Sequence, residues 1–501
     1  MTTTNTTHGK VKGVDKLGCL QFRGIPFATP PLGTLRWQPP KPADKWDGVR
    51  DATEFGPTCP QNVGTMEAMG GVGRAAMPPM SEDCLTLNVW TPAADDARRP
   101  TMVWIHGGAF STGSGRTPWY SGHNFARDGV VVVTVNYRLN AFGFLRFDEL
   151  FDGFEGTGTL GIRDQIAALE WVRDNIANFG GDPDNLTIFG ESAGGMSVGT
   201  LLASPKAKGL FTKAIPQSGA GHNSHTEQDA SKIAEQFLDV VGVKAGDADA
   251  LLALSAEQIL EGAQGLAQTD VGRLPFQPCV GDDVVPVAPI DASRGGASKD
   301  VAVLVGTCRE EWKLFSLGIR EGQSLGRTHR PMQALFERAG KSADDVATVY
   351  EKKLATAERS GAAEQPSELD LRNAIETDRI FRIPAIRLAE AQVANGARTW
   401  MYRFDWPSKA MDGKLGACHA LEIPFAFDNL NAPGANFFTG EGAPQDVATE
   451  MHAAWVSFAR DGSPGWDAYD TERRATKLFD TPSTVADDPD GDTRVLWEGV
   501  L

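Results

Sequence analysis

The segment 185–195 constrains the fold of this chain more than any other stretch of its sequence. It reads Asn-Leu-Thr-Ile-Phe-Gly-Glu-Ser-Ala-Gly-Gly. Leu186, Ile188 and Phe189 predict a short buried strand, and the next five residues match the G-x-S-x-G turn that exposes a serine between a strand and a helix. Such a tight turn requires glycine at positions 190 and 194, because a Cβ there would collide with neighbouring backbone. Ser192 is therefore the candidate nucleophile.

Apolar runs elsewhere in the chain follow strand-like and helix-like patterns in turn. Residues 101–105 and 130–135 are continuous apolar runs, which suits strands that are covered on both faces of a mostly parallel sheet. Between 162 and 179, apolar positions three or four residues apart predict an amphipathic helix that stops at Gly180-Gly-Asp-Pro183. This order predicts a doubly wound α/β sheet, with further strands at 213–215, 301–305 and 399–404.

The remaining segments are expected to be insertions and connections around this sheet. Because its strands are spread from about residue 101 to residue 404, residues 1–501 are interpreted as a single domain. Residues 20–60 are rich in Pro, Gly and Trp and are expected to be irregular. Segments 227–267 and 330–358 have helical patterns and are expected to form lid or cap structure, whereas the acidic stretch 483–494 is expected to be a solvated loop.

The composition argues against several classes of partner. The chain has 501 residues and a formal net charge of -17, which argues against nucleic acid or an anionic membrane. No stretch reaches the roughly 20 apolar residues that a membrane span needs. The first residues lack the pattern of a signal peptide, so a cytoplasmic protein is expected. The 6 cysteines are widely scattered without a C-x-x-C pair, so no metal site is predicted.

A serine hydroxyl needs a general base, and the base needs an orienting acid. Among the 8 histidines, His419 is the best candidate because it follows the last predicted strand, late in the chain. Glu310 and Glu311 directly follow the strand predicted at 301–305, so their carboxylates would lie at the carboxyl edge of the sheet, where such sites are built. The pattern leaves the choice between these two carboxylates open, and it favours the chain order Ser, Glu, His.

A tetrahedral oxyanion needs preorganised hydrogen-bond donors. His106-Gly-Gly-Ala-Phe110 follows the strand predicted at 101–105 and supplies a glycine-rich turn. The amides of Gly108 and Ala109, together with the amide of Ala193, are predicted to form the oxyanion hole. Gly107 is expected to set the turn, and His106 is expected to brace it.

A second glycine motif suggests different chemistry. Gly156-Thr-Gly-Thr-Leu-Gly161 matches the dinucleotide fingerprint G-x-G-x-x-G, and Asp182 follows about 20 residues later. However, residues 147–154 are broken and acidic and do not predict the strand that must precede this fingerprint. No cofactor is therefore predicted.

Several motifs in a fixed order resemble the type-B carboxylesterase family, which holds carboxylesterases, bacterial para-nitrobenzyl esterases and cholinesterases. The resemblance covers most of the chain. It implies an α/β-hydrolase fold, with a central, mostly parallel sheet, flanking helices and lid or cap insertions. It also implies hydrolysis of carboxylic esters through an acyl-enzyme intermediate, without a cofactor. The motifs are Phe22-Arg-Gly-Ile-Pro26, Phe55-Gly-Pro-Thr-Cys-Pro-Gln61, Ser81-Glu-Asp-Cys-Leu-Thr-Leu-Asn88, His106-Gly-Gly-Ala-Phe110, Asn136-Tyr-Arg-Leu139, Phe179-Gly-Gly-Asp-Pro183, Phe189-Gly-Glu-Ser-Ala-Gly-Gly195, Gln217-Ser-Gly219 and His419-Ala-Leu-Glu-Ile-Pro-Phe425.

The resemblance also implies roles for single residues. The acid of the family is the last carboxylate of a G-x-x-[RK]-[DE]-E pattern, which here is Glu311, and its histidine is His419. Ser218 is implied to support the triad, and Glu191 is implied to act on the histidine electrostatically. The implied partner is a small-molecule ester, and the chain is expected to be a monomer or a weak homo-oligomer. Two alternatives stay open: a non-catalytic, neuroligin-like binding module, and a hydrolase that acts mainly on amides, carbamates or lactones.

The sequence departs from the family pattern at several positions. Leu314 stands where an aromatic residue is expected, and the Met-rich loop 62–80 has no evident counterpart of the ring that holds a quaternary ammonium in cholinesterases. Without an aromatic cage, acetylcholine is not expected to be a preferred substrate. Thr159 stands where asparagine is common, and Asn140 stands where a small residue is usual.

The resemblance also concerns pairs of residues. Cys59 and Cys84 align with a disulfide of secreted relatives, but in a reducing cytosol they are expected to be two thiols close in space. Two further pairs resemble buried ion pairs of the family and are interpreted as structural: Arg36 with Glu82, and Arg138 with Asp164.

Overall fold

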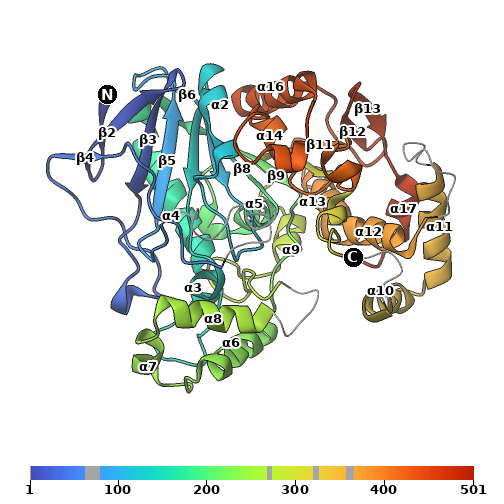
Figure 1. Cartoon of the computed structure of the whole chain (residues 1–501), viewed down its shortest axis with the longest axis horizontal. Coiled ribbons are helices and arrows are strands. Elements are labelled where there is room, and N and C mark those ends of the chain that lie inside the picture. The colour runs from blue at the N-terminus through green and yellow to red at the C-terminus, as the bar shows by residue number, and fades with distance from the viewer. Residues whose placement is uncertain (1, 63–78, 268–273, 320–325, 357–365) are drawn as a thin grey trace.

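The computed structural model (Figure 1) describes residues 2–62, 79–267, 274–319, 326–356 and 366–501. In this part of the chain, 13 strands form one sheet in the order β1-β2-β3-β5-β7-β6-β8-β9-β10-β11-β12-β13, and β4 pairs with β2. The strands are β1 Thr2–Thr6, β2 Gly9–Lys16, β3 Cys19–Pro26, β4 Val49–Asp51, β5 Thr86–Thr91, β6 Arg99–Ile105, β7 Val131–Val135, β8 Gly181–Glu191, β9 Lys213–Gln217, β10 Ala302–Cys308, β11 Thr399–Phe404, β12 Ala475–Phe479 and β13 Thr484–Asp487.

The central strands, in the order β7-β6-β8-β9-β10-β11-β12, run parallel to one another. Antiparallel pairing adds β5, β3 and β2 beyond β7 and adds β13 beyond β12. The mostly parallel sheet predicted from the sequence is confirmed. The register pairs Ile105 with Gly190, Glu191 with Gln217, and Gln217 with Gly306. The carboxyl ends of β6, β8, β9 and β10 therefore meet at one edge, where the candidate site residues follow.

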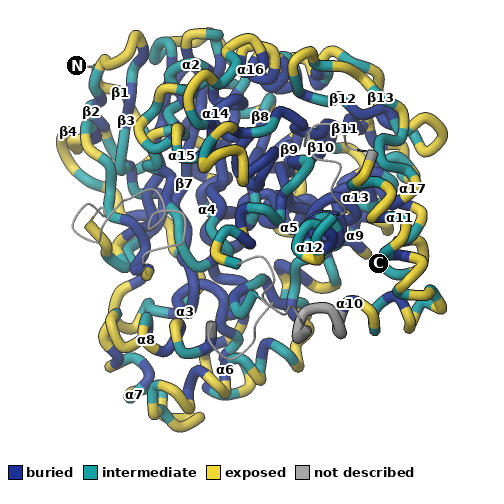
Figure 2. The backbone as a smooth tube through the Cα atoms, turned by 45° about the vertical axis from the view of Figure 1, so that its right-hand side comes forward, coloured by how far each residue is buried: buried dark blue, intermediate teal, exposed yellow. Residues whose placement is uncertain are grey.

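Both faces of the sheet are buried by helices. In β6, Val103 and Ile105 pack into one core, and Met102 and Trp104 pack into the other. Each of these side chains is at most 1% exposed, which explains the continuous apolar run of this strand. Figure 2 shows the buried backbone at the middle of the molecule and the exposed backbone around it.

Residues of α4, α5 and α13 belong to the first core, and residues of α2, α14 and α16 belong to the second. The helices of the described residues are α2 His123–Arg127, α3 Asn140–Gly143, α4 Leu160–Asn175, α5 Ala193–Ala203, α6 Glu227–Val241, α7 Ala248–Leu252, α8 Ala256–Ala267, α9 Pro289–Arg294, α10 Gly326–Arg338, α11 Ala343–Thr356, α12 Glu368–Thr377, α13 Ile383–Ala394, α14 Ile423–Ala426, α15 Asn436–Thr439, α16 Gln445–Asp461 and α17 Gly491–Leu496.

The predicted helices occur near their expected positions. The helix expected at 162–179 is α4, continued by a 3-10 turn at Ile176–Phe179. The helical insertion expected at 227–267 contains α6, α7 and α8, which lie together at the bottom of Figure 1, and the one expected at 330–358 contains α10 and α11. None of the helices in the described ranges is long and apolar enough to cross a membrane. The Met-rich loop 62–80 lies mostly outside the described residues.

The expectation of irregular structure at 20–60 is wrong for two segments. β3 pairs antiparallel with β5, and the short strand β4 pairs with β2. The register of β3 shifts between Phe22 and Ile25, around Gly24 with its φ of +64°. This irregularity interrupts the alternation by which a strand is recognised from sequence.

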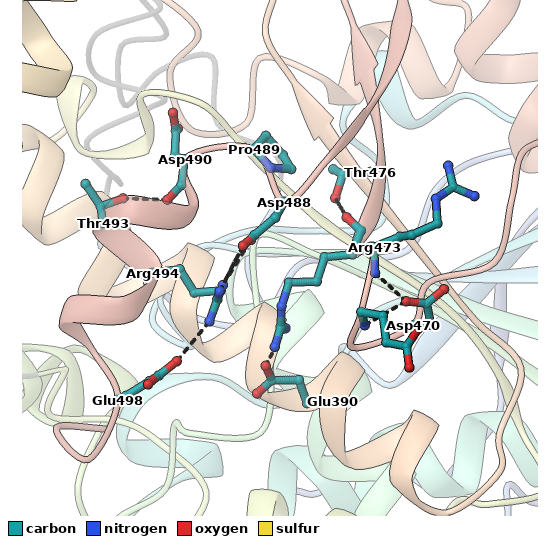
Figure 3. Close-up of polar contacts among 12 residues, drawn as sticks. Glu390, Asp470, Arg473, Thr476, Asp488, Pro489, Asp490, Thr493, Arg494 and Glu498 are labelled. Carbon is teal, nitrogen blue, oxygen red and sulfur yellow. Dashed lines mark hydrogen bonds and ion pairs between the residues drawn. The ribbon is translucent and has the colours of Figure 1, made fainter.

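The expectation of a loop at 483–494 is also wrong, although the residues of β13 are mostly exposed to solvent as expected. This segment contains β13 and begins α17. Figure 3 shows that Asp488 accepts hydrogen bonds from Arg494, with 2.8 Å between Oδ2 and Nη2. Asp490 accepts from Arg403 Nη1 at 2.7 Å. Asp488 and Asp490 are thus held by arginines of the same and of a neighbouring element.

Candidate active site

The chain turns sharply at Ser192, between β8 and α5. Ser192 has φ 58° and ψ -125°, and its amide donates to Gln217 O at 3.0 Å. A Cβ on Gly190 would lie 2.5 Å from Ile105 O, and a Cβ on Gly194 would lie 2.0 Å from the same oxygen. Both positions therefore require glycine, in agreement with the steric argument from the sequence.

Glu311 lies in a 3-10 turn, Glu311–Lys313, that follows β10, and its side chain is fully buried. Its Oε1 accepts hydrogen bonds from the Cys308 amide at 2.7 Å and from Ser218 Oγ at 2.7 Å. Its Oε2 lies 2.6 Å from His419 Nδ1. Two donors thus orient a buried carboxylate toward the imidazole.

The neighbouring Glu310 points elsewhere. Its Oε1 forms an ion pair with Lys313 Nζ at 2.6 Å, and its Oε2 accepts from the Ala417 amide at 2.9 Å. Of the two carboxylates that the sequence pattern left open, Glu311 is the one that contacts the histidine.

His419 lies in a loop after β11 and is 3% exposed. Its Nε2 lies 3.1 Å from Oε1 of Glu191, the residue that precedes Ser192, so the imidazole is next to the serine turn. Glu191 Oε1 has no hydrogen-bond partner among the described residues. Among the described residues, Glu191 and His419 therefore form an ion pair without a hydrogen bond at Oε1.

The charge on the imidazole is set by the surrounding carboxylates. Burial lowers the pKa of His419, but Glu191 and Glu311 outweigh burial and raise this pKa to about 9. Burial also raises the pKa of Glu191 well above its usual range, with a contribution from Glu422. The imidazolium and the Glu191 carboxylate therefore stabilise each other, and their titrations are linked.

The turn at 107–112 packs against Ser192. A Cβ on Gly107 would lie 2.6 Å from Glu191 O and 3.0 Å from Ser192 Cβ, so only glycine permits this approach. Neither Gly108 nor Ala109 donates its amide to any acceptor in the described ranges. The Ala193 amide opens α5 and has no acceptor within the helix. Three free amides thus come from the two segments that pack together at the serine.

His106 is buried beneath this turn. Its Nδ1 lies 2.9 Å from Gly107 O, its ring stacks on Tyr137, and Tyr137 Oη donates to His106 O at 2.8 Å. Burial lowers the pKa of His106 to about 4, so the ring is neutral near pH 7. These contacts fit the bracing role expected for this histidine.

Two aromatic side chains flank His419. The ring centroid of Phe381 lies 4.7 Å from that of His419, and the ring centroid of Phe315 lies 5.1 Å away. Phe381 is buried, whereas Phe315 is 49% exposed. Leu314, where an aromatic was expected, is buried in the second core. The wall beside the imidazole is therefore apolar, and half of Phe315 is open to solvent.

Glu422 and Cys308 also belong to this cluster, although neither was predicted from the sequence as a site residue. Glu422 is fully buried, its Oε2 lies 3.1 Å from Cys308 Sγ, and its Oε1 accepts from Gln217 Nε2 at 3.2 Å. Burial raises the pKa of Glu422. Its position three residues after His419 was the available signal, because a charged residue in an otherwise apolar run needs a buried partner.

The pairs implied by the resemblance lie outside this cluster. Arg138 and Asp164 form a buried pair with 2.7 Å between Nη2 and Oδ1, and Arg36 Nε lies 2.7 Å from Glu82 Oε2. Cys59 and Cys84 are both buried free thiols. The two cysteines are therefore not bonded to each other in this structure. Thr159, which stands where the family commonly has asparagine, donates a hydrogen bond from Oγ1 to Asp282 Oδ2.

The described residues include no group of three His, Cys, Asp or Glu side chains that is arranged to hold a metal ion. The glycine motif at 156–161 forms a 3-10 turn, Thr157–Thr159, and the start of α4. No strand lies between Val135 and Gly181, where the structure describes every residue. The motif therefore lacks the strand that a dinucleotide fingerprint needs.

Comparisons with known proteins show which family this chain resembles along most of its length. A family model described as the carboxylesterase family matches residues 1–487. The para-nitrobenzyl esterase of Bacillus subtilis (strain 168) is 40% identical over 98% of this chain and 97% of its own length. The phenmedipham hydrolase of Pseudarthrobacter oxydans is 34% identical over 97% of this chain and 93% of its own length. A crystal structure of a Geobacillus stearothermophilus carboxylesterase matches with a TM-score of 0.86 and 41% identity, covering 99% of this chain and 100% of that one.

Proposed function

Since this chain belongs to the carboxylesterase family, we propose that it hydrolyses carboxylic esters through an acyl-enzyme formed on Ser192. The enzyme class, a carboxylic-ester hydrolase, follows from the family. The assignment of the catalytic groups is our proposal, with Ser192 as nucleophile, His419 as general base and acid, and Glu311 as the orienting carboxylate. Its main support is the 2.6 Å contact between Glu311 Oε2 and His419 Nδ1, beside the serine turn.

In the first half of the reaction, Ser192 Oγ attacks the ester carbonyl carbon while His419 Nε2 accepts its proton. Glu311 stabilises the imidazolium through Nδ1, and the amides of Gly108, Ala109 and Ala193 bind the oxyanion. The tetrahedral intermediate then collapses, His419 gives the proton to the departing alkoxide, and the alcohol leaves. Removal of one oxyanion donor typically costs about 3 kcal/mol of transition-state stabilisation.

In the second half, a water molecule attacks the acyl-serine ester. His419 accepts the proton of this water, and the same amides bind the second oxyanion. Collapse releases the carboxylic acid and returns the proton to Ser192 Oγ. No step needs a metal or a redox cofactor to balance.

Three residues support this machinery without taking part in bond making. Ser218 fixes Glu311 by donating from Oγ at 2.7 Å, and Glu191 stabilises the imidazolium from 3.1 Å. Gly107 lets the oxyanion turn approach Ser192, because a Cβ there would lie 2.6 Å from Glu191 O.

We propose small, uncharged esters as the substrate class. The wall beside His419 is built from Phe315 and Phe381, and Leu314 replaces the aromatic residue that a cage for quaternary ammonium would use. Acetylcholine is therefore a poor candidate. Comparison of an ester with the amide, carbamate and lactone of matched shape tests the bond that is cleaved, and faster turnover of any of these would move the enzyme to that class.

The test of the triad is the variant Ser192→Ala, measured with a nitrophenyl ester. We expect a folded protein whose kcat/KM falls by about four orders of magnitude or more. Ser457→Ala in α16 is a matched control and should keep full activity, because among the described residues its hydroxyl donates to a backbone carbonyl, Ser463 O. A fluorophosphonate should label the wild type once, at Ser192. Failure of this label to attach would favour the neuroligin-like binding module, and near-normal turnover by Ser192→Ala would refute the nucleophile.

We further propose that residues 1–501 act as one domain, since one sheet takes strands from Thr2–Thr6 through Thr484–Asp487. A cytoplasmic location fits the 6 free thiols, and a monomer or weak homo-oligomer without a nucleic-acid partner fits the net charge of -17. A single cooperative unfolding transition, cell fractionation and sedimentation test these three statements.

A further inference from the structure

The oxyanion turn adopts backbone conformations that L-amino acids rarely use. Gly108 has a φ of +113°, and the next two residues, Ala109 and Phe110, both have a φ of +56°. A non-glycine residue in this region costs of order 1 kcal/mol, and such a conformation persists only when its surroundings hold it. The amides that we assign to the oxyanion hole therefore depend on contacts outside the turn.

Part of the restraint is internal to the turn. The amides of Ser111 and Thr112 both donate to Gly108 O, at 2.9 Å and 3.0 Å. These bonds close the turn on itself, but they do not fix its position relative to the rest of the protein.

Asn140 supplies a restraint from outside the turn. Its amide donates to Phe110 O at 2.7 Å, and its Nδ2 donates both to Ser111 O at 3.3 Å and to Pro60 O at 3.0 Å. Its Oδ1 accepts from the Phe142 amide at 3.4 Å. Asn140 is 3% exposed, so its side chain is almost entirely shielded from bulk water. It bridges the oxyanion turn to the segment that precedes position 62.

We propose that Asn140 is a positioning residue for the oxyanion hole. Its side-chain amide fixes the turn so that the Gly108 and Ala109 amides are already aimed when negative charge develops on the substrate oxygen. The inference rests on the proposed function, because it assumes that these amides bind the oxyanion. Since the oxyanion exists only in the tetrahedral state, loss of this restraint lowers kcat and leaves KM nearly unchanged.

The backbone of Asn140 explains which residue types serve here. Its φ is +44°, a region that glycine enters freely and that asparagine tolerates better than most residues. Glycine therefore fits the backbone but supplies no side-chain amide. Aspartate has the same shape, but its carboxylate oxygen would face the carbonyl oxygens of Pro60 and Ser111. The asparagine at a position where a small residue is usual thus adds two donated bonds.

The test compares Asn140→Gly with Asn140→Asp. For Asn140→Gly we expect kcat to fall about tenfold, a fraction of the effect of losing a whole oxyanion donor, with KM within about twofold of the wild type. For Asn140→Asp we expect a larger fall. The affinity for phenylboronic acid, which forms a tetrahedral adduct with a serine hydroxyl, should fall in parallel with kcat. The pH dependence of kcat/KM should not move, because no contact of His419 changes.

Asn395→Ala is the matched control. The side chain of Asn395 also donates its amide to backbone carbonyls, those of Ser293, Arg294 and Ala391, but at the end of α13. This variant should lower the melting temperature and leave kcat and boronate affinity unchanged. If Asn140 had a purely structural role, Asn140→Gly would likewise lower the melting temperature and leave kcat and boronate affinity unchanged.

Each outcome decides the proposal. Wild-type kcat and boronate affinity in a folded Asn140→Gly would overturn it, and so would equal losses in Asn140→Gly and Asn395→Ala. Failure of both Asn140 variants to fold would also overturn it, because a restraint confined to the oxyanion turn leaves the fold intact. The fluorophosphonate labelling of Ser192 in the wild type is scored separately, so failure of the proposed function is recognised independently of Asn140.

Discussion

Replacement of Glu191 by glutamine tests how the carboxylate beside the serine controls the base. Glu191 is 2% exposed, and its Oε1 lies 3.1 Å from His419 Nε2. Glutamine keeps the shape and removes the charge. Because Oε1 accepts no hydrogen bond among the described residues, the substitution breaks none at that oxygen.

The magnitude follows from the separation of the charges. Two unit charges 3.1 Å apart interact by roughly 5 kcal/mol at an effective dielectric constant of about 20, which is a ceiling of about four pKa units. Burial raises the pKa of Glu191, so this carboxylate carries its full charge only when the imidazolium is present. We therefore expect Glu191→Gln to lower the pKa of His419 by about one to three units.

The sign follows from the role of the base, which must be neutral to accept a proton. Loss of the negative charge destabilises the imidazolium, so His419 loses its proton at a lower pH. The acid limb of kcat/KM moves to lower pH in Glu191→Gln. The plateau at high pH falls, because the imidazolium that forms in the transition state also loses a stabilising charge.

The assay is kcat/KM for a nitrophenyl ester between about pH 5 and 10, read at the isosbestic wavelength of nitrophenol. Glu422→Gln should shift the limb in the same direction by a smaller amount, because Glu422 contributes less to the raised pKa of His419 than Glu191 does. Glu376→Gln, a buried carboxylate of α12 that pairs with Arg379, should leave the limb in place. An unmoved limb in folded Glu191→Gln, or a shift to higher pH, would refute the electrostatic account.

Two further predictions concern the groups around the serine. Gly194→Ala should lower the free energy of unfolding by more than about 3 kcal/mol, measured by chemical unfolding, because its Cβ would lie 2.0 Å from Ile105 O. The control Gly318→Ala should be neutral, because a Cβ at that position would meet no atom within 4 Å. Equal stability of the two variants would contradict the close approach of this turn to β6. Ser218→Ala should lower kcat about tenfold with little change in KM, because it removes the hydroxyl that donates to Glu311 Oε1 at 2.7 Å. An unchanged kcat would show that the other contacts of Glu311 are enough to orient its carboxylate.

The central elements were predictable because their signals are local. The apolar run at 101–105 became β6, buried on both faces, and the strand expected at 399–404 is β11 with the same bounds. The steric demand for glycine at 190 and 194 follows from the turn motif alone. These features depend on residues within one element, so the sequence of that element is enough to predict them.

The edge elements and the supporting contacts depend on partners far away in the chain. β3 forms because β5, more than 60 residues later, accepts its irregular register, and the acidic segment that contains Asp490 is ordered by Arg403. Glu422 was missed because only the fold brings it beside Cys308 and Gln217. The sequence pattern identifies the reacting groups, whereas the residues that set their charge are identified by the packing.

Asn140 shows why such a residue is not found from sequence. Its position was noticed only as a departure from a small residue, and nothing in its neighbours indicates a positive φ or a partner. Its Nδ2 contacts Pro60 O across 80 residues and Ser111 O across 29. A residue acts in this way when one side chain satisfies the backbone of two loops at once, and that condition exists only after both loops have been placed by the sheet. Substitutions that alter the rate without touching the triad are therefore expected first at such bridging positions.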